Sequence, residues 1–371
     1  MILLWIIIPL FILYSILIIF YWLSWRSIPN FIPAENLPQT TISVIIPARN
    51  EESNIGFLLT ALQQQTYPKE LFEVIVIDDH SEDRTAEIVK QFNTIKLLQL
   101  QYDNINSYKK KAIETGIAAA TGELIVTTDA DCLPPENWLQ TIASFKEEKH
   151  AVFIVAPVVI NCNSSIIQIF QAMDFMVLQG ITGAGVYKKK LSMCNGANLA
   201  YERKVFYEVS GFAGTDHIAS GDDMLLMHKI WKKYSDKVYY LRSGEAIVST
   251  QPVKSWKDFF SQRIRWSSKA RQYNDTRILP VLILVYFFNL SFIALMIGGI
   301  WYHSYWLVLL LLWFFKALIE ISFFWSLAIF FNKQWAVKWF FFFQPLHIFY
   351  TVISGLFGQL GKYEWKGRRV R

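Results

Sequence analysis

The sequence predicts an α/β domain with a mostly parallel sheet, flanked at both ends of the chain by transmembrane helices. Short β-branched runs alternate with helical segments over residues 40–250, an order typical of a parallel sheet covered on both faces. Apolar residues concentrate at the two ends of the 371-residue chain, in which 53% of residues are hydrophobic and 18% are charged. Because an ordinary soluble domain is about one quarter charged, these values argue against a purely cytosolic, fibrous or disordered protein.

Residues 1–26 are predicted to form an uncleaved membrane anchor. Ile2 to Leu23 carry no charge, and roughly 20 such residues cross a hydrocarbon core. A signal peptide would have a basic start and a small-residue cleavage site, and the segment has neither. Arg26 follows the segment, and no Lys or Arg precedes it. The positive-inside rule then predicts an integral protein of the bacterial inner-membrane type, with its amino terminus outside and the next domain in the cytosol.

The strand–helix alternation follows the anchor, after a stiff linker that contains Pro29, Pro33 and Pro38. Three β-branched runs are predicted as strands: Ile42–Ile46, Glu73–Ile77 and Glu123–Thr127. Asn50 and Ser81 are expected to cap the helices that follow the first two strands. Residues 111–120 read as a helix, whereas the glycine-rich stretch 180–185 is expected to be a mobile loop.

The carboxy-terminal part is predicted to be a transmembrane region over residues 278–360, followed by a basic tail at 361–371. Its apolar blocks are 279–300, 305–331 and 335–357. Three crossings would leave the tail outside, yet its basic residues favour the inside, so one of the last two blocks is expected to be re-entrant or interfacial. Lys316 and Glu320 lie on one helical face, either as a self-satisfied pair within a bundle or as a polar wall of a substrate path.

Residues 252–277 are predicted to form an amphipathic helix in the headgroup plane, with a solvated surface helix as the alternative. The apolar residues at helical spacing are Trp256, Phe259, Phe260 and Ile264. The basic residues lie mostly elsewhere on the helical wheel: Lys254, Lys257, Arg265, Lys269 and Arg271. The net charge of +6 gathers here and in the tail, which indicates a membrane surface and not nucleic acid.

Pairs of aspartates stand at the predicted strand ends and at one helix start: Asp78 with Asp79, Asp129 with Asp131, and Asp222 with Asp223. Two carboxylates at positions i and i+2 of an extended chain point the same way and repel each other unless a cation lies between them. Mg²⁺ or Mn²⁺ suits such oxygens and is usually shared with substrate phosphates. A metal-bound diphosphate also suits a basic residue such as Lys109 or Lys110, of which we assign Lys110 to the donor site. The 3 cysteines are widely spaced, which favours a reduced compartment without a zinc site.

The order of these motifs resembles family-2 glycosyltransferases with the GT-A fold, the group that contains cellulose, chitin and hyaluronan synthases and the ceramide glucosyltransferases. The matching stretches are 45–52 (IIPARNEE), 77–85 (IDDHSEDRT), 128–131 (TDAD), 195–201 (NGANLAY), 220–225 (SGDDML) and 262–266 (QRIRW). The resemblance covers most of residues 42–270, and the anchor and the carboxy-terminal blocks resemble those of the membrane-bound members.

The resemblance implies a role for each matched residue. The nucleotide of a nucleotide-sugar donor would contact Pro47, Arg49, Glu51 and Asp79. Asp129 would contact the nucleotide or its metal, Asp131 would ligate the metal, and Asp223 would be the catalytic base. The acceptor and diphosphate side would comprise Asp222, Asn198, Gln262, Arg265 and Trp266. Two positions depart from the family pattern, since Arg49 replaces a common Tyr and Asp222 replaces a Glu.

The residue types fit sugar transfer on chemical grounds as well. A sugar hydroxyl is a poor nucleophile, so a carboxylate must take its proton as it attacks the anomeric carbon. The diphosphate departs with growing negative charge, on which a metal ion and an arginine such as Arg265 can act. One base and one leaving-group clamp give a single displacement with inversion, whereas retention would need a separate enzymic nucleophile.

The sequence therefore predicts a membrane-anchored inverting glycosyltransferase that uses a nucleotide-diphosphate sugar, with a UDP-sugar favoured, and Mg²⁺ or Mn²⁺. A lipid acceptor is favoured, and processive polysaccharide synthesis is the alternative. A catalytically dead binding module, a nucleotidyltransferase and a transporter remain as weaker hypotheses. The aspartate pairs argue against a catalytically dead binding module. The acidic stretch 48–52 argues against a nucleotidyltransferase, because an enzyme of that kind, such as a pyrophosphorylase, would have a glycine-rich basic loop there.

Overall fold

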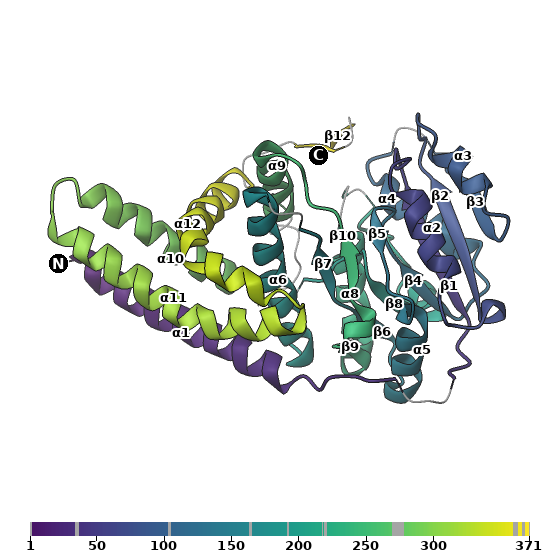
Figure 1. Ribbon diagram of the computed structural model, residues 1–371, viewed down its shortest axis with the longest axis horizontal. Helices are drawn as coiled ribbons and strands as arrows, with labels where there is room; N and C mark the ends of the chain where they lie inside the picture. Colours follow the sequence, from purple (N-terminus) through teal and green to yellow (C-terminus); the bar gives the residue numbers. More distant parts are fainter. Residues whose placement is uncertain are drawn as a thin grey trace. The chain divides into compact units, whose positions relative to one another are not determined.

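The computed structural model describes residues 2–33, 37–102, 105–162, 165–190, 193–216, 218, 221–268, 278–358, 363–365 and 368–370. Ser220, residues 269–277 of the predicted interfacial helix and much of the 361–371 tail lie outside this description. The chain divides into two compact units (Figure 1). An α/β unit contains most of residues 37–161 and 193–251, and a helical unit contains 2–28, 165–190 and most of 252–358.

A seven-stranded sheet forms the centre of the α/β unit. Its strands follow the order β3 (Ile95–Gln99), β2 (Phe72–Asp78), β1 (Ile42–Ala48), β4 (Leu124–Thr127), β8 (Leu199–Glu202), β6 (Phe153–Val155) and β9 (Val238–Tyr240). Strands β3 to β4 are parallel, β8 is antiparallel to both its neighbours, and β9 is parallel to β6. The predicted α/β class with a mostly parallel sheet is confirmed.

Smaller elements complete this unit. A three-stranded sheet comprises β5 (Cys132–Leu133), β10 (Val248–Thr250) and β7 (Val158–Ile160). The helices are α2 (Ile55–Gln63), α3 (Thr85–Lys90), α4 (Tyr108–Ala118), α5 (Trp138–Lys149), α7 (Arg203–Glu208) and α8 (Asp222–Tyr234). Apart from this unit's sheets, β11 (Tyr363–Trp365) and β12 (Arg368–Val370) form a two-stranded sheet near the carboxy terminus. Strands β1 and β4 are almost wholly buried, as their continuous apolar sequences require when helices cover both faces.

The two helix caps predicted from the sequence are wrong. Helix α2 begins at Ile55 and α3 at Thr85, in each case some residues beyond the expected cap. Asn50 has a positive φ of 51°, and its Oδ1 accepts a hydrogen bond from the Glu82 amide at 2.9 Å. The Ser81 hydroxyl accepts from the Asn50 amide at 3.0 Å. Both side chains therefore join the β1–α2 loop to the β2–α3 loop instead of capping their own helices.

A glycine in the last turn of α4 sets how closely this helix approaches the sheet. A Cβ atom on Gly116 would lie 2.7 Å from both Ile45 Cγ2 and Ile77 Cδ1, whereas one on Gly56 of α2 would lie 3.6 Å from its nearest neighbour, Ile88 Cγ2. We therefore expect Gly116→Ala to destabilise the α/β unit by about 1–3 kcal/mol through overpacking. The control Gly56→Ala should stabilise it by up to ~1 kcal/mol, because alanine favours helix. Thermal unfolding of both variants measures the difference, and an equal rise in Tm would contradict it.

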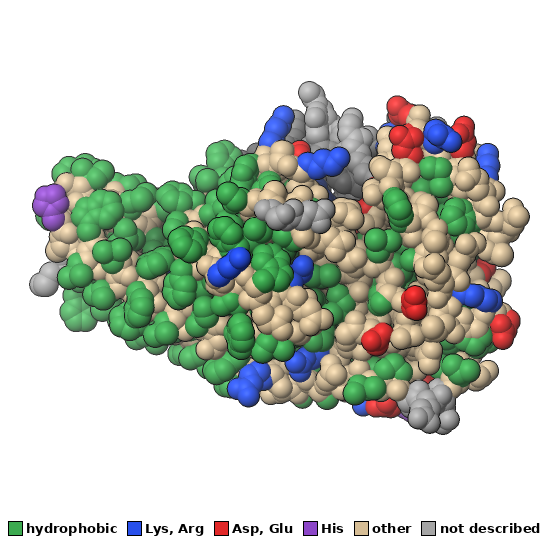
Figure 2. All heavy atoms as spheres, viewed as in Figure 1, with side chains coloured by type: hydrophobic (Ala, Val, Ile, Leu, Met, Phe, Trp, Pro, Cys, Tyr) green, Lys and Arg blue, Asp and Glu red, His purple; other side chains and the backbone are tan. Residues whose placement is uncertain are grey.

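The helical unit consists of long apolar helices and one shorter helix. Its members are α1 (Ile2–Ser27), α6 (Ile166–Tyr187), α9 (Trp256–Ser267), α10 (Ile278–Gly298), α11 (Ser304–Phe330) and α12 (Phe340–Phe357). Helices α1, α10 and α11 run side by side (Figure 1). The visible face of this unit is mostly hydrophobic, whereas acidic side chains gather over the α/β unit (Figure 2). Among the described residues, 5 helices are long and apolar enough to cross a membrane, and all but α9 are among them.

Helix α6 differs most from the sequence prediction. It lies within the predicted domain 40–250, yet it packs against α1 and α11 of the helical unit. The glycine-rich stretch 180–185 is helical, so the predicted mobile loop is wrong. A Cβ on Gly180 would collide with side chains of Leu327 and Phe323 on α11. Small residues on one side of a helix allow close helix–helix approach, which explains glycines in a helix.

A buried polar cluster joins three helices of this unit. Lys316 is fully buried on α11, and its Nζ lies 2.7 Å from Glu320 Oε1. Gln344 on α12 accepts from Lys316 Nζ at 2.5 Å and donates to Glu320 Oε2 at 2.7 Å. The Tyr14 hydroxyl on α1 donates to Glu320 as well. Buried charges are costly unless they are paired and hydrogen-bonded. The cluster therefore supports the interpretation of Lys316 and Glu320 as a self-satisfied pair within a bundle.

Candidate active site

The loops after β1 and β2 form one end of the site. Arg49 follows β1, and its Nη1 donates to the carbonyl oxygens of Asp79 (2.8 Å) and His80 (3.0 Å). The Asp79 amide in turn donates to the Ala48 carbonyl at 2.8 Å. Because β1 and β2 are paired in parallel up to Ala48 and Asp78, their loops leave the same edge of the sheet. Arg49 and Asp79 are thus in contact, and Pro47 lies at the same edge of the sheet.

Two acidic side chains at this end are held in defined positions. Asp79 is 4% exposed, and its Oδ1 lies 3.0 Å from Nδ1 of His80. Glu51 accepts a hydrogen bond from the Asn54 side chain at 2.8 Å, and its backbone amide donates to Thr85 Oγ1 at 2.7 Å. The β1–α2 and β2–α3 loops are therefore hydrogen-bonded to each other, and each carries a carboxylate of the predicted site.

A lysine on α4 bridges two of the aspartate pairs. Lys109 Nζ lies 2.6 Å from Asp129 Oδ1 and 3.4 Å from Asp222 Oδ2. Burial by itself would lower the pKa of Lys109, but the carboxylates of Asp129 and Asp222 outweigh it and raise that pKa above its ordinary value. Lys109 therefore carries its positive charge throughout the physiological pH range. The strand end at Asp129 and the start of α8 consequently belong to one site.

Asp131 lies two residues beyond Asp129, beside a buried thiol. The Cys132 Sγ lies 3.7 Å from Asp131 Oδ1, and Thr250 Oγ1 lies 3.4 Å from Asp131 Oδ2. Burial, and after it the charges of Asp131 and Asp129, raise the pKa of Cys132. The Cys132 thiol therefore lies close enough to Asp131 and Asp129 for both negative charges to affect it.

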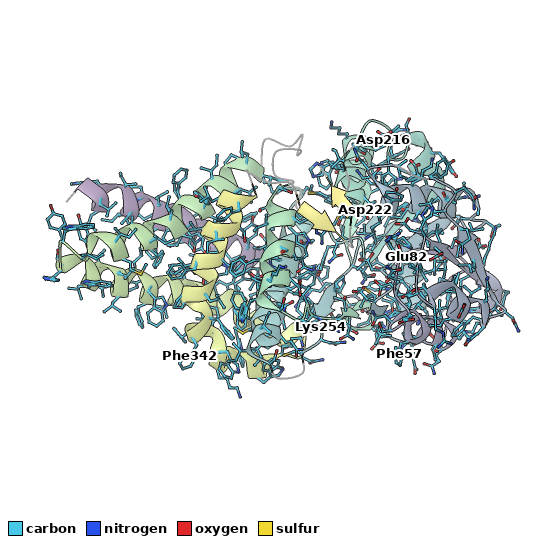
Figure 3. The ribbon with its side chains drawn as sticks, turned by 90° about the horizontal axis from the view of Figure 1, so that it is seen from above. Phe57, Glu82, Asp216, Asp222, Lys254 and Phe342 are labelled. Atoms are coloured by element: carbon cyan, nitrogen blue, oxygen red, sulfur yellow. The ribbon has the colours of Figure 1, made fainter. Side chains whose placement is uncertain are left out.

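The first turn of α8 positions Asp222 and Asp223 differently. Asp222 is 7% exposed and faces Lys109. Asp223 is less buried, and its Oδ2 accepts from the Gly196 amide at 3.2 Å, while its Oδ1 accepts from the Met224 amide at 2.7 Å. A Cβ on Gly196 would lie 3.0 Å from Asp222 Oδ2 and 3.4 Å from Lys109 Nζ. A side chain at Gly196 would therefore crowd Asp222 and Lys109. Asp222, Glu82 and Asp216 all belong to the α/β unit (Figure 3).

The donor atoms at Asp129 and Asp131 suit a hard divalent cation. Both supply carboxylate oxygens, the ligands that Mg²⁺ and Mn²⁺ prefer. The described residues contain no group of three or more His, Cys, Asp or Glu side chains placed to hold a metal. Two carboxylates without a full protein cage match a cation that completes its coordination with substrate phosphates and water. The residues therefore fit the predicted metal.

Two predicted site residues lie elsewhere than expected. Lys110 is buried, and its Nζ donates to the carbonyls of Thr215 (2.6 Å) and Ile218 (2.9 Å), so Lys109 occupies the position beside the aspartates. Asn198 has no exposed surface. Its amide donates to the carbonyls of Pro157 and Ala246, both at 2.8 Å, and accepts from Trp138 Nε1 at 3.0 Å. In this conformation Asn198 supports the fold and has no surface to offer to an acceptor.

The QxxRW residues lie on α9, in the helical unit. Gln262, Arg265 and Trp266 are partly buried, and the helix begins with a Ser255 cap that accepts from the Asp258 amide. Phe259 is fully buried against Phe170 of α6 and Tyr350 of α12, with ring centroids 5.4 Å apart in each pair. The apolar side of the predicted amphipathic helix therefore contacts other helices of the unit.

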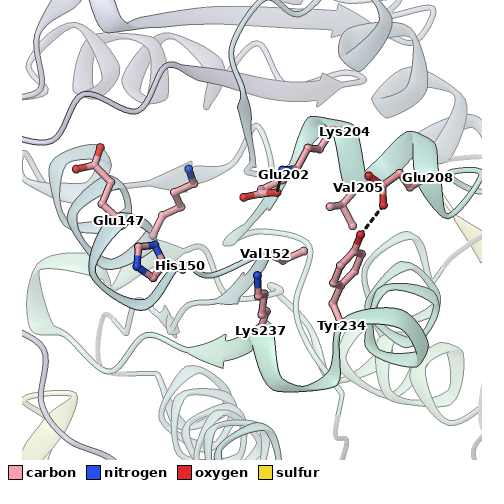
Figure 4. A pocket seen from close by; sticks show the side chains of 10 residues that line it. Glu147, His150, Val152, Glu202, Lys204, Val205, Glu208, Tyr234 and Lys237 are labelled. Atoms are coloured by element: carbon pink, nitrogen blue, oxygen red, sulfur yellow. Dashed lines mark hydrogen bonds and ion pairs between the residues drawn. The ribbon is translucent and has the colours of Figure 1, made fainter.

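A cavity of about 310 Å³ lies elsewhere in the α/β unit (Figure 4). Its lining includes Val152, Glu202 and Lys237. Val152 and Lys237 precede β6 and β9, and Glu202 pairs with Leu124, the first residue of β4. The cavity is thus at the amino-terminal edge of the parallel strands, opposite the edge from which Asp129 and Asp79 project. It is not the site formed by the aspartates.

Comparison with known proteins agrees with this geometry. Residues 43–210 match the family model described as Glycosyl transferase family 2. The chain is 29% identical over 257 residues to the probable glycosyltransferase YdaM of Bacillus subtilis, a match that covers 67% of this chain and 59% of the relative. It is also 29% identical over 237 residues to glycosyltransferase AglE of Haloferax volcanii, covering 60% of this chain and 71% of that protein.

A solved structure shares the fold. The mannosyltransferase PcManGT of Pyrobaculum calidifontis, solved in complex with GDP-Man and Mn²⁺, superposes with a TM-score of 0.58 over 95% of this chain and 96% of its own, at 19% sequence identity. The family match confirms the resemblance read from the motifs, and this neighbour confirms the predicted GT-A fold. Residues 43–210 therefore match the family 2 model, and the chain has the GT-A fold.

Proposed function

We propose that the protein is an inverting glycosyltransferase that moves a sugar from a nucleotide-diphosphate sugar to a membrane lipid. One observation carries the proposal: in a unit whose residues 43–210 match the family 2 model, Lys109 pairs with both Asp129 and Asp222, which stand close in sequence to Asp131 and Asp223. A cluster of carboxylates around a single lysine suits a ligand that brings both a cation and a phosphorylated sugar.

The donor nucleotide is assigned to the β1–α2 and β2–α3 loops. Pro47, Arg49, Glu51 and Asp79 surround the carboxyl ends of two parallel strands, where ligands of open α/β sheets bind. Asp129, at the end of the neighbouring strand β4, is placed to contact the nucleotide or its cation. We favour a UDP-sugar as donor. Lys109 replaces Lys110 in the proposal as the basic residue near the donor.

The catalytic base is assigned to Asp223. Two backbone amides orient its carboxylate, and it is more exposed than Asp222, which is engaged with Lys109. Asp223 would accept the proton of the acceptor hydroxyl as its oxygen bonds to the anomeric carbon and the bond to the diphosphate breaks. General-base assistance of this kind contributes roughly 10²–10⁴-fold.

The leaving diphosphate is assigned to Asp129 and Asp131. The two aspartates would hold Mg²⁺ or Mn²⁺, which would neutralise part of the diphosphate charge. By resemblance to the family, Gln262, Arg265 and Trp266 would act on the diphosphate and acceptor. A single base and a single leaving-group clamp favour inversion at the anomeric carbon.

The acceptor is proposed to be a lipid, because the chain adds several long apolar helices to the family 2 domain. Arg26 at the end of α1 favours a cytosolic α/β unit, by the positive-inside rule. The predicted alternative, processive polysaccharide synthesis, would need enough helices to enclose a growing sugar chain.

The proposal is tested by incubating purified full-length protein, in native-lipid vesicles, with a panel of labelled nucleotide sugars. We expect label from one UDP-sugar to enter the organic phase as a product with a single added sugar, provided that Mg²⁺ or Mn²⁺ is present. Label in a long water-soluble polymer would support the processive alternative. No transfer from any donor would contradict the proposed activity.

A further inference from the structure

We propose that Arg263, held by Asp174, is a positioning residue that fixes the side chains of the QxxRW motif. Arg263 occupies a variable position of that motif, between Gln262 and Arg265, and neither it nor Asp174 was assigned a role from the sequence. The inference rests on the proposed function, since it concerns how Gln262 and Trp266 are held for the reaction.

Asp174 is an isolated carboxylate in an apolar helix. It is the only charged residue of α6, a helix with composition and length suited to a membrane, and its side chain is 3% exposed. An ionisable group in such surroundings is costly and usually marks a function. The Tyr350 hydroxyl on α12 donates a hydrogen bond to one oxygen of Asp174, Oδ1.

Arg263 satisfies the second oxygen of this carboxylate. Its Nε donates to Asp174 Oδ2 at 3.0 Å, and its Nη2 lies 2.6 Å from the same oxygen. The Arg263 side chain is 4% exposed, so the pair is shielded from water and from salt. The ion pair thus anchors one side of α9 to α6, and through Tyr350 to α12.

The remaining surfaces of Arg263 contact the QxxRW motif itself. Its Nη1 donates to Gln262 Oε1 at 3.0 Å. The guanidinium carbon lies 4.3 Å from the Trp266 ring centroid and 4.7 Å from that of Phe259, as in cation–π pairs. On α6, Phe175 next to Asp174 also packs near Trp266, with ring centroids 6.1 Å apart. One anchored guanidinium therefore fixes both the amide of Gln262 and the indole of Trp266.

A structural role alone would not require this arrangement. Buried ion pairs are often replaceable by apolar residues of similar size without loss of stability, so they are weak explanations of stability. A planar guanidinium is needed, however, to reach Gln262 and stack on two rings at once, which a lysine ammonium cannot do. Misplacing a reactive group by about 1 Å can cost 10²-fold in rate.

The test compares Asp174→Asn and Arg263→Lys with a matched control, Glu320→Gln. The control removes a carboxylate from another buried ion pair of the same helical unit, Lys316–Glu320, whose hydrogen bonds described above go to Tyr14 and Gln344. Full-length proteins in lipid nanodiscs are measured for Tm, for kcat and donor KM of sugar transfer, and for backbone hydrogen exchange over residues 262–267.

We expect Asp174→Asn and Arg263→Lys to lower kcat by about 10²-fold with little change in donor KM, and to speed exchange over 262–267. Glu320→Gln should leave kcat and this exchange unchanged even where it lowers Tm as much. Equal kcat and equal exchange in all proteins would overturn the proposal. A fall in kcat that is in proportion to the fall in Tm in all three variants would overturn it as well. If the unchanged protein transfers no sugar, the proposed function fails, and the exchange measurement still decides whether Arg263 holds the motif.

Discussion

Replacing Asp223 with Asn is expected to reduce sugar transfer by roughly 10²–10⁴-fold, because the amide cannot accept the proton of the acceptor hydroxyl. Asn is nearly the same size as Asp, and its single oxygen can keep one of the two hydrogen bonds that the Gly196 and Met224 amides now donate. The fold and the donor affinity should therefore persist. Transfer of label from the nucleotide sugar to the lipid fraction measures the loss.

The control for this variant is Asp216→Asn, which removes an exposed carboxylate of the same unit to which no role in the site is assigned. It should leave kcat within about twofold, in keeping with the small effects of surface changes. Undiminished transfer by Asp223→Asn would falsify the base assignment. The same loss from both substitutions would show that the effect is not specific to the site.

Replacing Asp131 with Asn is expected to lower transfer by about 10²–10³-fold, the usual cost of removing one stabiliser of the developing charge. The substitution takes a negative charge from the proposed cation site, so a higher Mn²⁺ concentration should be needed for half-maximal rate. Transfer measured over a Mn²⁺ titration, after chelation of bound metal, reports both changes.

Thr250→Val serves as the matched variant for Asp131. It removes the hydroxyl that lies 3.4 Å from Asp131 Oδ2 but keeps both carboxylates of the Asp-x-Asp motif. We expect a loss of less than about tenfold, the effect of one hydrogen bond. If Asp131→Asn showed the same Mn²⁺ dependence as the unchanged protein, Asp131 would not be a ligand of the cation.

The strand ends of the site could be predicted because periodicity and burial decide them. Each of the three predicted strands lies within an observed strand or overlaps it closely, and parallel pairing then brings Asp79 and Asp129 to one edge. The caps could not be predicted in the same way. Asn50 and Ser81 are good capping residues, but the partners they bond lie about 30 positions away, on the other loop.

The other site residues were harder to predict, because the sequence does not show which way a side chain points from its helix. Lys109 and Lys110 are neighbours in sequence but are separated by about 100° around α4, so one faces the aspartates and the other faces buried carbonyls. The sequence cannot fix that rotation without the packing of Gly116 on the sheet. Asp174 did carry a readable signal, as a lone charge in an apolar helix. Its partner Arg263 carried no such signal, because it stands at a variable position of the QxxRW motif.

Calorimetric titration with UDP and its sugar conjugates, with and without Mn²⁺, tests the central claim most directly, because it needs no knowledge of the acceptor. The account predicts that one nucleotide binds the unchanged protein only when Mn²⁺ is present. It also predicts that Asp131→Asn loses this Mn²⁺-dependent binding, whereas Asp223→Asn retains it. Equal nucleotide binding without Mn²⁺ and in Asp131→Asn would contradict the claim that these aspartates hold a metal-bound diphosphate.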